Sequence, residues 1–168
     1  MPSEATPAET PQAPYSARCY CGGTRLLFRA PPTTSSYCHC IDCRRWTGAP
    51  LAAFAAFCDD AIATPLPANK ATCVNPGVWR WNCTDCGSPL AARFDYLPGQ
   101  TYIPLGILDQ AQATEFAPRL HSHADSALPW LHVADDLPRA GSSARDRLNA
   151  ATDAVSYTHL TLPTNREV

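Results

Sequence analysis

The sequence has little charge and no long apolar run. Of its 168 residues, 17% are charged and the formal net charge is −2, so we expect no basic surface of the kind that binds nucleic acid or an anionic membrane. No window approaches the roughly 20 consecutive apolar residues that a membrane-spanning helix needs. The composition therefore predicts no nucleic-acid partner and no membrane association.

The first residues, MPSEATPAETPQAPYS, lack both the basic start and the apolar run of a secretory signal. A reducing cytoplasm is therefore the expected location, and there clustered cysteines indicate metal sites before disulfides. The same segment is rich in Pro, Ala, Glu and Ser, so residues 1–17 are expected to form a disordered lead-in.

Long helices are also not expected, because the chain contains 17 prolines. From Cys19 to about Arg139 it consists of short, partly alternating apolar runs bounded by turn residues, which is typical of strands. The expected strands are 24–30, 51–58, 77–83, 89–97 and 101–108. Only 40–48 suggests a helical turn, closed by Gly48. We predict one mainly β domain over residues 18–139.

Residues 140–168 are predicted to form a polar tail. GSSARDRLNAATDA is loop-like or weakly helical, and the composition changes abruptly at VSYTHLTLPTNREV. This last stretch resembles a terminal segment that arises when sequencing-adapter DNA is read as coding sequence, so we treat it as not native and exclude it from the fold. An ordinary C-terminal strand is the alternative.

What the chain does have is cysteine, nine in all, mostly in tight clusters. Two close pairs end in glycine, which lets the chain turn sharply around the sulfurs. The pairs are Cys19-x-Cys21 and Cys83-x-x-Cys86. Together they supply the four thiolates of a closed tetrahedral zinc site. The alternative is a set of reduced cysteines packed as small apolar side chains.

A second cluster, Cys38-His39-Cys40-x-x-Cys43, has three thiols. Three protein ligands and an open position are the mark of a zinc ion that meets a substrate. With three thiolates the ion carries a formal charge of about −1, which suits it to holding an incoming thiol as the nucleophilic thiolate rather than to polarising carbonyls. We predict the three cysteines as ligands of a catalytic zinc, with His39 in an orienting or packing role.

Arg44 and Arg45 follow this cluster directly. They could offset its negative charge and grip a carboxylate in bidentate fashion, or they could form a solvated turn. The four tryptophans are expected in the core or in a pocket wall. Cys58 and Cys73 stand alone and are expected to be buried bystanders.

In order and spacing, these motifs resemble the glutathione-dependent formaldehyde-activating enzyme family, which is also related to the domain of centromere protein V. The resemblance covers about residues 16–138. It rests on the order of the seven clustered cysteines, the TGAP turn, LPGQTYIPLGILDQ, Pro118, His121 and Trp130. Ser122 and His123 stand where the family usually has apolar or aromatic residues, a departure expected to alter the pocket wall.

The resemblance implies twisted antiparallel sheets pinned by zinc, and a carbon–sulfur lyase that adds glutathione to formaldehyde, giving S-(hydroxymethyl)glutathione, and reverses that addition. It implies two zinc ions per chain, a structural one on Cys19, Cys21, Cys83 and Cys86 and a catalytic one on Cys38, Cys40 and Cys43. The expected substrate contacts are Arg44, Arg45, His121 and Trp130. The alternative function is a non-catalytic zinc-binding module that recognises a small thiol or a protein partner. No oligomeric state follows from the sequence.

Overall fold

The structure is a computed structural model that describes residues 13–141. One α-helix, α1, spans Ile41–Thr47 in this part, and short 3-10 turns join several of the strands. The strands are β1 (Tyr15–Arg18), β2 (Arg25–Phe28), β3 (Thr34–Cys38), β4 (Ala52–Cys58), β5 (Val78–Asn82), β6 (Pro89–Phe94), β7 (Gln100–Pro104) and β8 (His121–Ser122).

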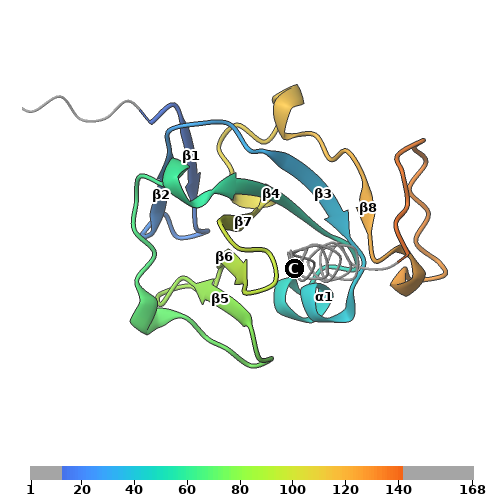
Figure 1. The fold of residues 1–168 in the computed structure, drawn as a ribbon, viewed down its shortest axis with the longest axis horizontal. Helices are drawn as coiled ribbons and strands as arrows, with labels where there is room; N and C mark the ends of the chain where they lie inside the picture. Colours follow the sequence, from blue (N-terminus) through green and yellow to red (C-terminus); the bar gives the residue numbers. More distant parts are fainter. Residues whose placement is uncertain (1–12, 142–168) are drawn as a thin grey trace, which may run out of the picture.

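These strands form two sheets (Figure 1). β1 and β2 pair with each other, and the other six lie in the order β5-β6-β7-β4-β3-β8. Neighbouring strands are antiparallel except β3 and β8, which are parallel. The predicted mainly β fold of antiparallel sheets with little helix is therefore confirmed.

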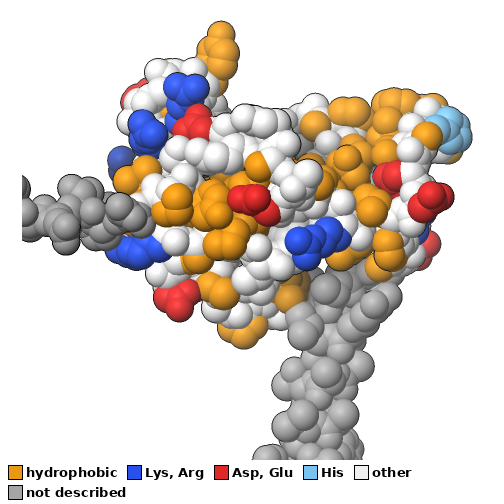
Figure 2. Space-filling view, turned by 90° about the horizontal axis from the view of Figure 1, so that it is seen from above, with side chains coloured by type: hydrophobic (Ala, Val, Ile, Leu, Met, Phe, Trp, Pro, Cys, Tyr) orange, Lys and Arg blue, Asp and Glu red, His pale blue; other side chains and the backbone are white. Residues whose placement is uncertain are grey.

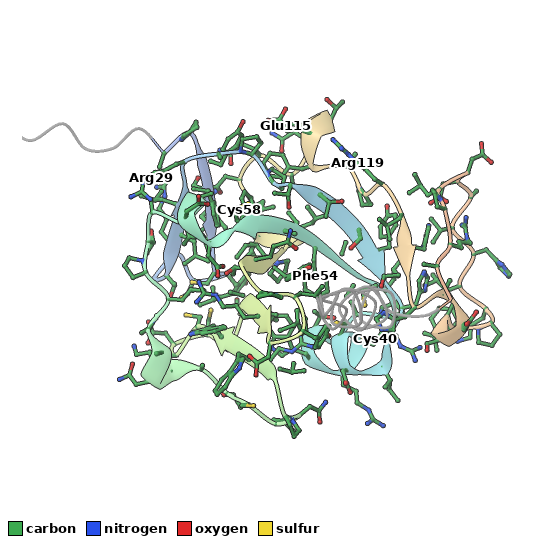
Figure 3. All side chains as sticks on the ribbon, in the orientation of Figure 1. Arg29, Cys40, Phe54, Cys58, Glu115 and Arg119 are labelled. Carbon is green, nitrogen blue, oxygen red and sulfur yellow. The ribbon has the colours of Figure 1, made fainter. Side chains whose placement is uncertain are left out.

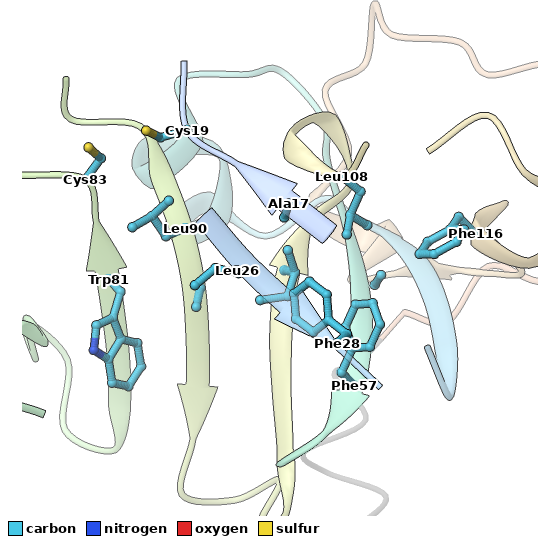
Figure 4. Close-up of a cluster of buried hydrophobic side chains, with 13 residues drawn as sticks. Ala17, Cys19, Leu26, Phe28, Phe57, Trp81, Cys83, Leu90, Leu108 and Phe116 are labelled. Carbon is cyan, nitrogen blue, oxygen red and sulfur yellow. The ribbon is translucent and has the colours of Figure 1, made fainter. Parts of the chain in front are cut away.

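The main core joins the β1–β2 pair to the middle of the larger sheet (Figure 4). Phe28 of β2 stacks on Phe57 of β4 with ring centroids 4.2 Å apart, and both side chains are fully buried. Burying one such side chain contributes about 1.5–3 kcal/mol. Cys19 and Cys83 belong to the same cluster and lie at one end of it. The first predicted metal site therefore forms an edge of the main core.

A smaller core lies where α1 packs on the larger sheet. Cys38, Cys43, Ala52 and Phe54 are its buried members, and Cys40, Trp46 and Tyr102 pack against them. Figure 3 shows Cys40 at the start of α1 and Phe54 on β4. The helix ends at Gly48, whose φ of 70° is left-handed and whose N–H donates to the carbonyl of Arg44. The sulfurs of the second cluster are thus part of what holds α1 to the sheet.

Most of the expected strands are present, with three differences. The lead-in prediction is wrong for residues 15–17, because β1 begins at Tyr15 and pairs with β2. Two strands, β3 and β8, were not expected. The expected strand 101–108 ends at Pro104, and Leu105–Ile107 form a 3-10 turn.

Residues 1–12 and 142–168 lie outside the described part of the chain, so the rest of the lead-in and nearly all of the tail predicted for 140–168 lie there too. Among the described residues, no helix has the length and apolarity needed to cross a membrane. On the face seen in Figure 2, charged side chains are scattered among apolar ones rather than gathered in one area.

Candidate metal centres

The structure brings the two distant cysteine pairs together. One ligand sulfur from each of Cys19, Cys21, Cys83 and Cys86 lies within 4.8 Å of all the others. The sulfurs of Cys19 and Cys21 are 3.4 Å apart, and those of Cys21 and Cys83 are 3.9 Å apart. Around a tetrahedral zinc with bonds of about 2.3 Å, sulfur atoms lie about 3.8 Å from one another. The four thiols therefore fit a closed zinc site.

Backbone and hydroxyl donors surround these four sulfurs. The N–H of Thr24 donates to the sulfur of Cys19 at 3.2 Å. The hydroxyl of Thr24 lies 3.5 Å from the sulfur of Cys83. The hydroxyl of Ser88 lies 3.2 Å from the sulfur of Cys86, and hydrogen bonds with the side chain and backbone of Ser88 and then the backbone of Cys21 lower the pKa of Cys86 to about 6. Donors of this kind stabilise thiolates, which are the form that binds a metal.

The second group consists of Cys38, Cys40 and Cys43, whose sulfurs also lie within 4.8 Å of one another. Cys38 ends β3, Cys40 is the N-cap of α1, and Cys43 lies in the first turn of the helix. The sulfur of Cys40 accepts the N–H of Cys43 at 3.3 Å, which fixes the geometry of the turn. Cys38 and Cys43 are buried and Cys40 is half-buried.

Three thiols this close cannot all ionise without a cation. Hydrogen bonds from Cys38 and then from Cys43 lower the pKa of Cys40 to about 2, while the hydrogen bond with Cys40 raises the pKa of Cys38. The hydrogen bonds within the group thus favour ionisation of Cys40 over that of Cys38. A divalent ion would let all three ionise, and soft thiolates suit zinc.

His39, between two of these cysteines, points away from the sulfur group into a buried chain of polar side chains. Its Nε2 lies 2.8 Å from Nδ1 of His121, and Nε2 of His121 lies 3.0 Å from a carboxylate oxygen of Asp135. If a neutral His121 donates to Asp135 through Nε2–H, its Nδ1 accepts from Nε2–H of His39, and Nδ1 of a neutral His39 is then unprotonated. That atom is buried without a hydrogen-bond partner. Burial lowers the pKa of His39.

Three of the four expected substrate residues line one open groove beside α1. Arg44, Arg45 and Trp130 share this hollow of about 470 Å³ with Ile41 and Leu128. The volume is within the range of small-molecule sites. Trp130 is 64% exposed there, so the groove combines an accessible indole ring with two arginines.

His121 is not in the groove. It is fully buried, and it lines a smaller cavity of about 170 Å³ together with His39 and Arg139. Both of its ring nitrogens have partners in the chain described above. Its position therefore gives no direct support to the expected role in binding substrate.

Comparison with protein families matches residues 14–126 to the GFA family, the glutathione-dependent formaldehyde-activating enzymes. This chain belongs to that family. Comparison with curated proteins gave no match. Among solved structures, a crystal structure of a Rhodobacter sphaeroides protein is 23% identical, with a TM-score of 0.43 over 56% of this chain and 88% of that one. A likeness at this level does not bear on function.

Two residues of this GFA protein stand near the three-cysteine group although spacing gave them no role there. Nδ1 of His123 lies 3.8 Å from the sulfur of Cys38. Its φ of 55° is the only positive value at a non-glycine residue in the described part of the chain. The sequence did mark His123 as a departure from the family pattern. Nη2 of Arg80 lies 3.6 Å from the sulfur of Cys43. No motif in the sequence pointed to Arg80.

The remaining cysteines belong to neither group. Cys58 is half-buried, and Cys73 is exposed with its thiol 3.3 Å from the carbonyl of Asn75. The expectation that Cys73 is buried is therefore wrong, because the Pro-Gly turn that follows it lies at the surface. Of the tryptophans, Trp81 is in the main core and Trp46 packs against the smaller one.

Proposed function

We propose that this GFA protein is a zinc-dependent carbon–sulfur lyase of the S-(hydroxymethyl)glutathione synthase type, acting in a reducing compartment such as the cytoplasm. Cys38, Cys40 and Cys43 would hold the catalytic zinc. The other four clustered cysteines, Cys19, Cys21, Cys83 and Cys86, would hold a structural one.

The observation that carries the proposal is the separation of the seven thiols into a group of four and a group of three. The group of three lies under α1, and the same helix contributes Ile41, Arg44 and Arg45 to the groove with Trp130. A thiol that bears carboxylates could lie in this groove, because guanidinium groups bind carboxylates in bidentate fashion. Glutathione has these features.

The reaction asks little of the side chains beyond binding and orientation. The sulfur of the thiol forms a bond to the carbon of formaldehyde, the π electrons of the carbonyl move to its oxygen, and that oxygen takes up the proton lost by the thiol. A bound zinc ion would keep the incoming sulfur as its thiolate. Arg44, Arg45 and Trp130 would hold the rest of the molecule, so most of the acceleration would come from proximity and orientation.

Nuclear magnetic resonance exchange spectroscopy with formaldehyde and a series of thiols tests the proposal. We expect exchange to be faster with glutathione than with cysteine or mercaptoethanol. Equal rates for all thiols, or no rate above background, would contradict the glutathione assignment. A non-catalytic module would bind glutathione without changing the approach to equilibrium.

A matched pair of arginine variants locates the binding groove. Arg45→Gln removes one charge-assisted contact and should raise the glutathione concentration for half-maximal exchange about tenfold. Arg119→Gln is the control, since Arg119 is exposed and is not in the groove. An equal effect of the two changes would mean that the groove does not bind the tripeptide.

A further inference from the structure

Arg80 is an arginine in an unusual place. It lies on β5, beneath α1, and is only 8% exposed. Its guanidinium carbon lies 4.3 Å from the ring centroid of Trp46 and 5.6 Å from that of Phe94. Trp46 is itself held by a hydrogen bond from its indole N–H to Asn82. The cation is thus fixed between two rings, and a buried cation of this kind requires a counter-charge.

In the part of the chain that the structure describes, no carboxylate supplies that charge. Within residues 13–141, the ion pairs of acidic side chains are with Arg18, Arg93, Arg139 and His121, and none is with Arg80. Nη1 of Arg80 is buried without a hydrogen-bond partner, and Nη2 lies 3.6 Å from the sulfur of Cys43. The sulfur group is therefore the anion that this guanidinium faces.

Charge counting shows what such a pairing would achieve. A divalent ion with three thiolates has a formal charge of about −1, which a single guanidinium cancels. Without that cation, a fourth anionic sulfur, from the substrate, would enter a site that is already negative and buried. With it, the site is neutral before the substrate thiolate binds.

We propose that Arg80 is the counter-charge of the three-cysteine group and the positioning residue that lets its metal accept a substrate thiolate as fourth ligand. This role rests on the proposed function. It differs from the sequence-based expectation, which gave charge compensation to Arg44 and Arg45. Those two arginines line the groove, where they are free to bind the carboxylates of the ligand.

The full chain loaded with cobalt(II) allows a test that does not depend on turnover. With the spectrum of cobalt-loaded Cys40→Ser subtracted, which removes the contribution of the four-cysteine group, visible absorption reports the affinity of the three-cysteine group for cobalt and the change in coordination when glutathione binds. We expect Arg80→Met to weaken cobalt binding about 10–100-fold, as loss of an outer-shell partner typically does, and glutathione binding by at least about tenfold. Arg80→Lys keeps the charge but loses the planar fork, so it should fall between Arg80→Met and the wild type.

Arg93 provides the matched control. It lies on the neighbouring strand β6, 5.7 Å from the ring of Trp81, and pairs with Asp59 rather than with a thiol. Arg93→Met should leave both affinities unchanged. The proposal is overturned if Arg80→Met binds glutathione like the wild type. It is also overturned if Arg80→Met and Arg80→Lys lose affinity for cobalt and glutathione equally, since that result would assign the effect to packing.

The wild type provides a readout that needs no variant. In metal-loaded protein, the guanidinium protons of Arg80 should exchange slowly with water and shift when zinc is replaced by cadmium, whereas those of Arg93 should not shift. Rapid exchange with no metal-dependent shift would contradict the pairing. If glutathione leaves the wild-type cobalt spectrum unchanged, the proposed function itself is wrong. If it changes the spectra of wild type and Arg80→Met equally, only the role of Arg80 is wrong.

Discussion

At the scale of single residues, the polar side chains buried around the three-cysteine group are held in defined positions by hydrogen bonds. His39 is 4% exposed and is hydrogen-bonded to His121, which in turn is hydrogen-bonded to Asp135. A buried imidazole of this kind is stable in its neutral form. Burial lowers the pKa of His39 most, and His121, Arg139 and Arg44 then lower it further.

His39 should therefore make stability depend on pH. Burial lowers its pKa from the ordinary value of about 6.5. Between the lowered pKa of the folded chain and the ordinary pKa of the unfolded chain, the unfolded chain binds a proton that the folded chain does not. The free energy of unfolding should therefore fall as the pH is lowered through about 6.5. His39→Gln removes this titration and should flatten the dependence.

Urea unfolding at about pH 7.5 and about pH 5.5, with metal content checked at each, measures this slope. His132→Gln, a change at an exposed histidine, is the control and should keep the wild-type slope. If the pH dependence of His39→Gln coincides with that of the wild type, the chain through His121 does not contribute to acid sensitivity.

At the scale of elements, the helix that bears two of the three cysteines is short and depends on its ends. Cys40 begins it by accepting the N–H of Cys43, and Gly48 ends it in the left-handed conformation. A side chain at Gly48 would meet no atom within 4 Å. The cost of a substitution there is therefore backbone strain alone.

Gly48→Ala should lower the free energy of unfolding by about 1–2 kcal/mol, the cost of a non-glycine residue with a left-handed backbone. Gly106 is a matched control, because it also has open space around it and no positive φ. Chemical denaturation of Gly48→Ala and Gly106→Ala measures the difference. Equal costs for the two would mean that the end of α1 is not held as the structure shows.

The elements also show where sequence reasoning succeeds. Runs such as 51–58 and 89–97 are apolar enough to be identified as strands without knowledge of their partners, and the structure has β4 and β6 there. β1 is different, because Ser16 in it depends on hydrogen bonds to Asp109 and Gln110, far along the chain. Such a long-range contact cannot be predicted from the residues around Ser16.

The residues of the site likewise fall into those that the sequence predicts and those that it does not. Cysteine spacing is a local signal, so the groups of four and of three could both be predicted from it. Arg80 and the partners of His39 reach the site through sheet pairing and through the loop after β8. Their roles follow only from the assembled fold.

At the scale of the whole molecule, the two thiol groups differ in what they connect. The group of four ties the start of the described chain to the turn between β5 and β6, at the edge of the main core. The group of three closes one short segment, from the end of β3 to the first turn of α1. Structural zinc in small modules contributes about 10–16 kcal/mol, which is comparable to or larger than the whole stability of a domain.

Serine substitutions in the two groups should therefore have different consequences. Cys83→Ser should unfold the domain or make it insoluble, because the metal that joins the distant segments is lost. Cys40→Ser should remain folded, with circular dichroism close to that of the wild type, and its zinc content should fall from about two ions per chain to about one. Reconstitution with zinc under reducing conditions precedes both measurements.

The rate of glutathione–formaldehyde exchange in folded Cys40→Ser tests the central claim most directly, namely that the chemistry takes place at the three-cysteine group. We predict a rate equal to the uncatalysed background in a protein that keeps its fold and its other zinc ion. A wild-type rate in Cys40→Ser would contradict the assignment of the catalytic site.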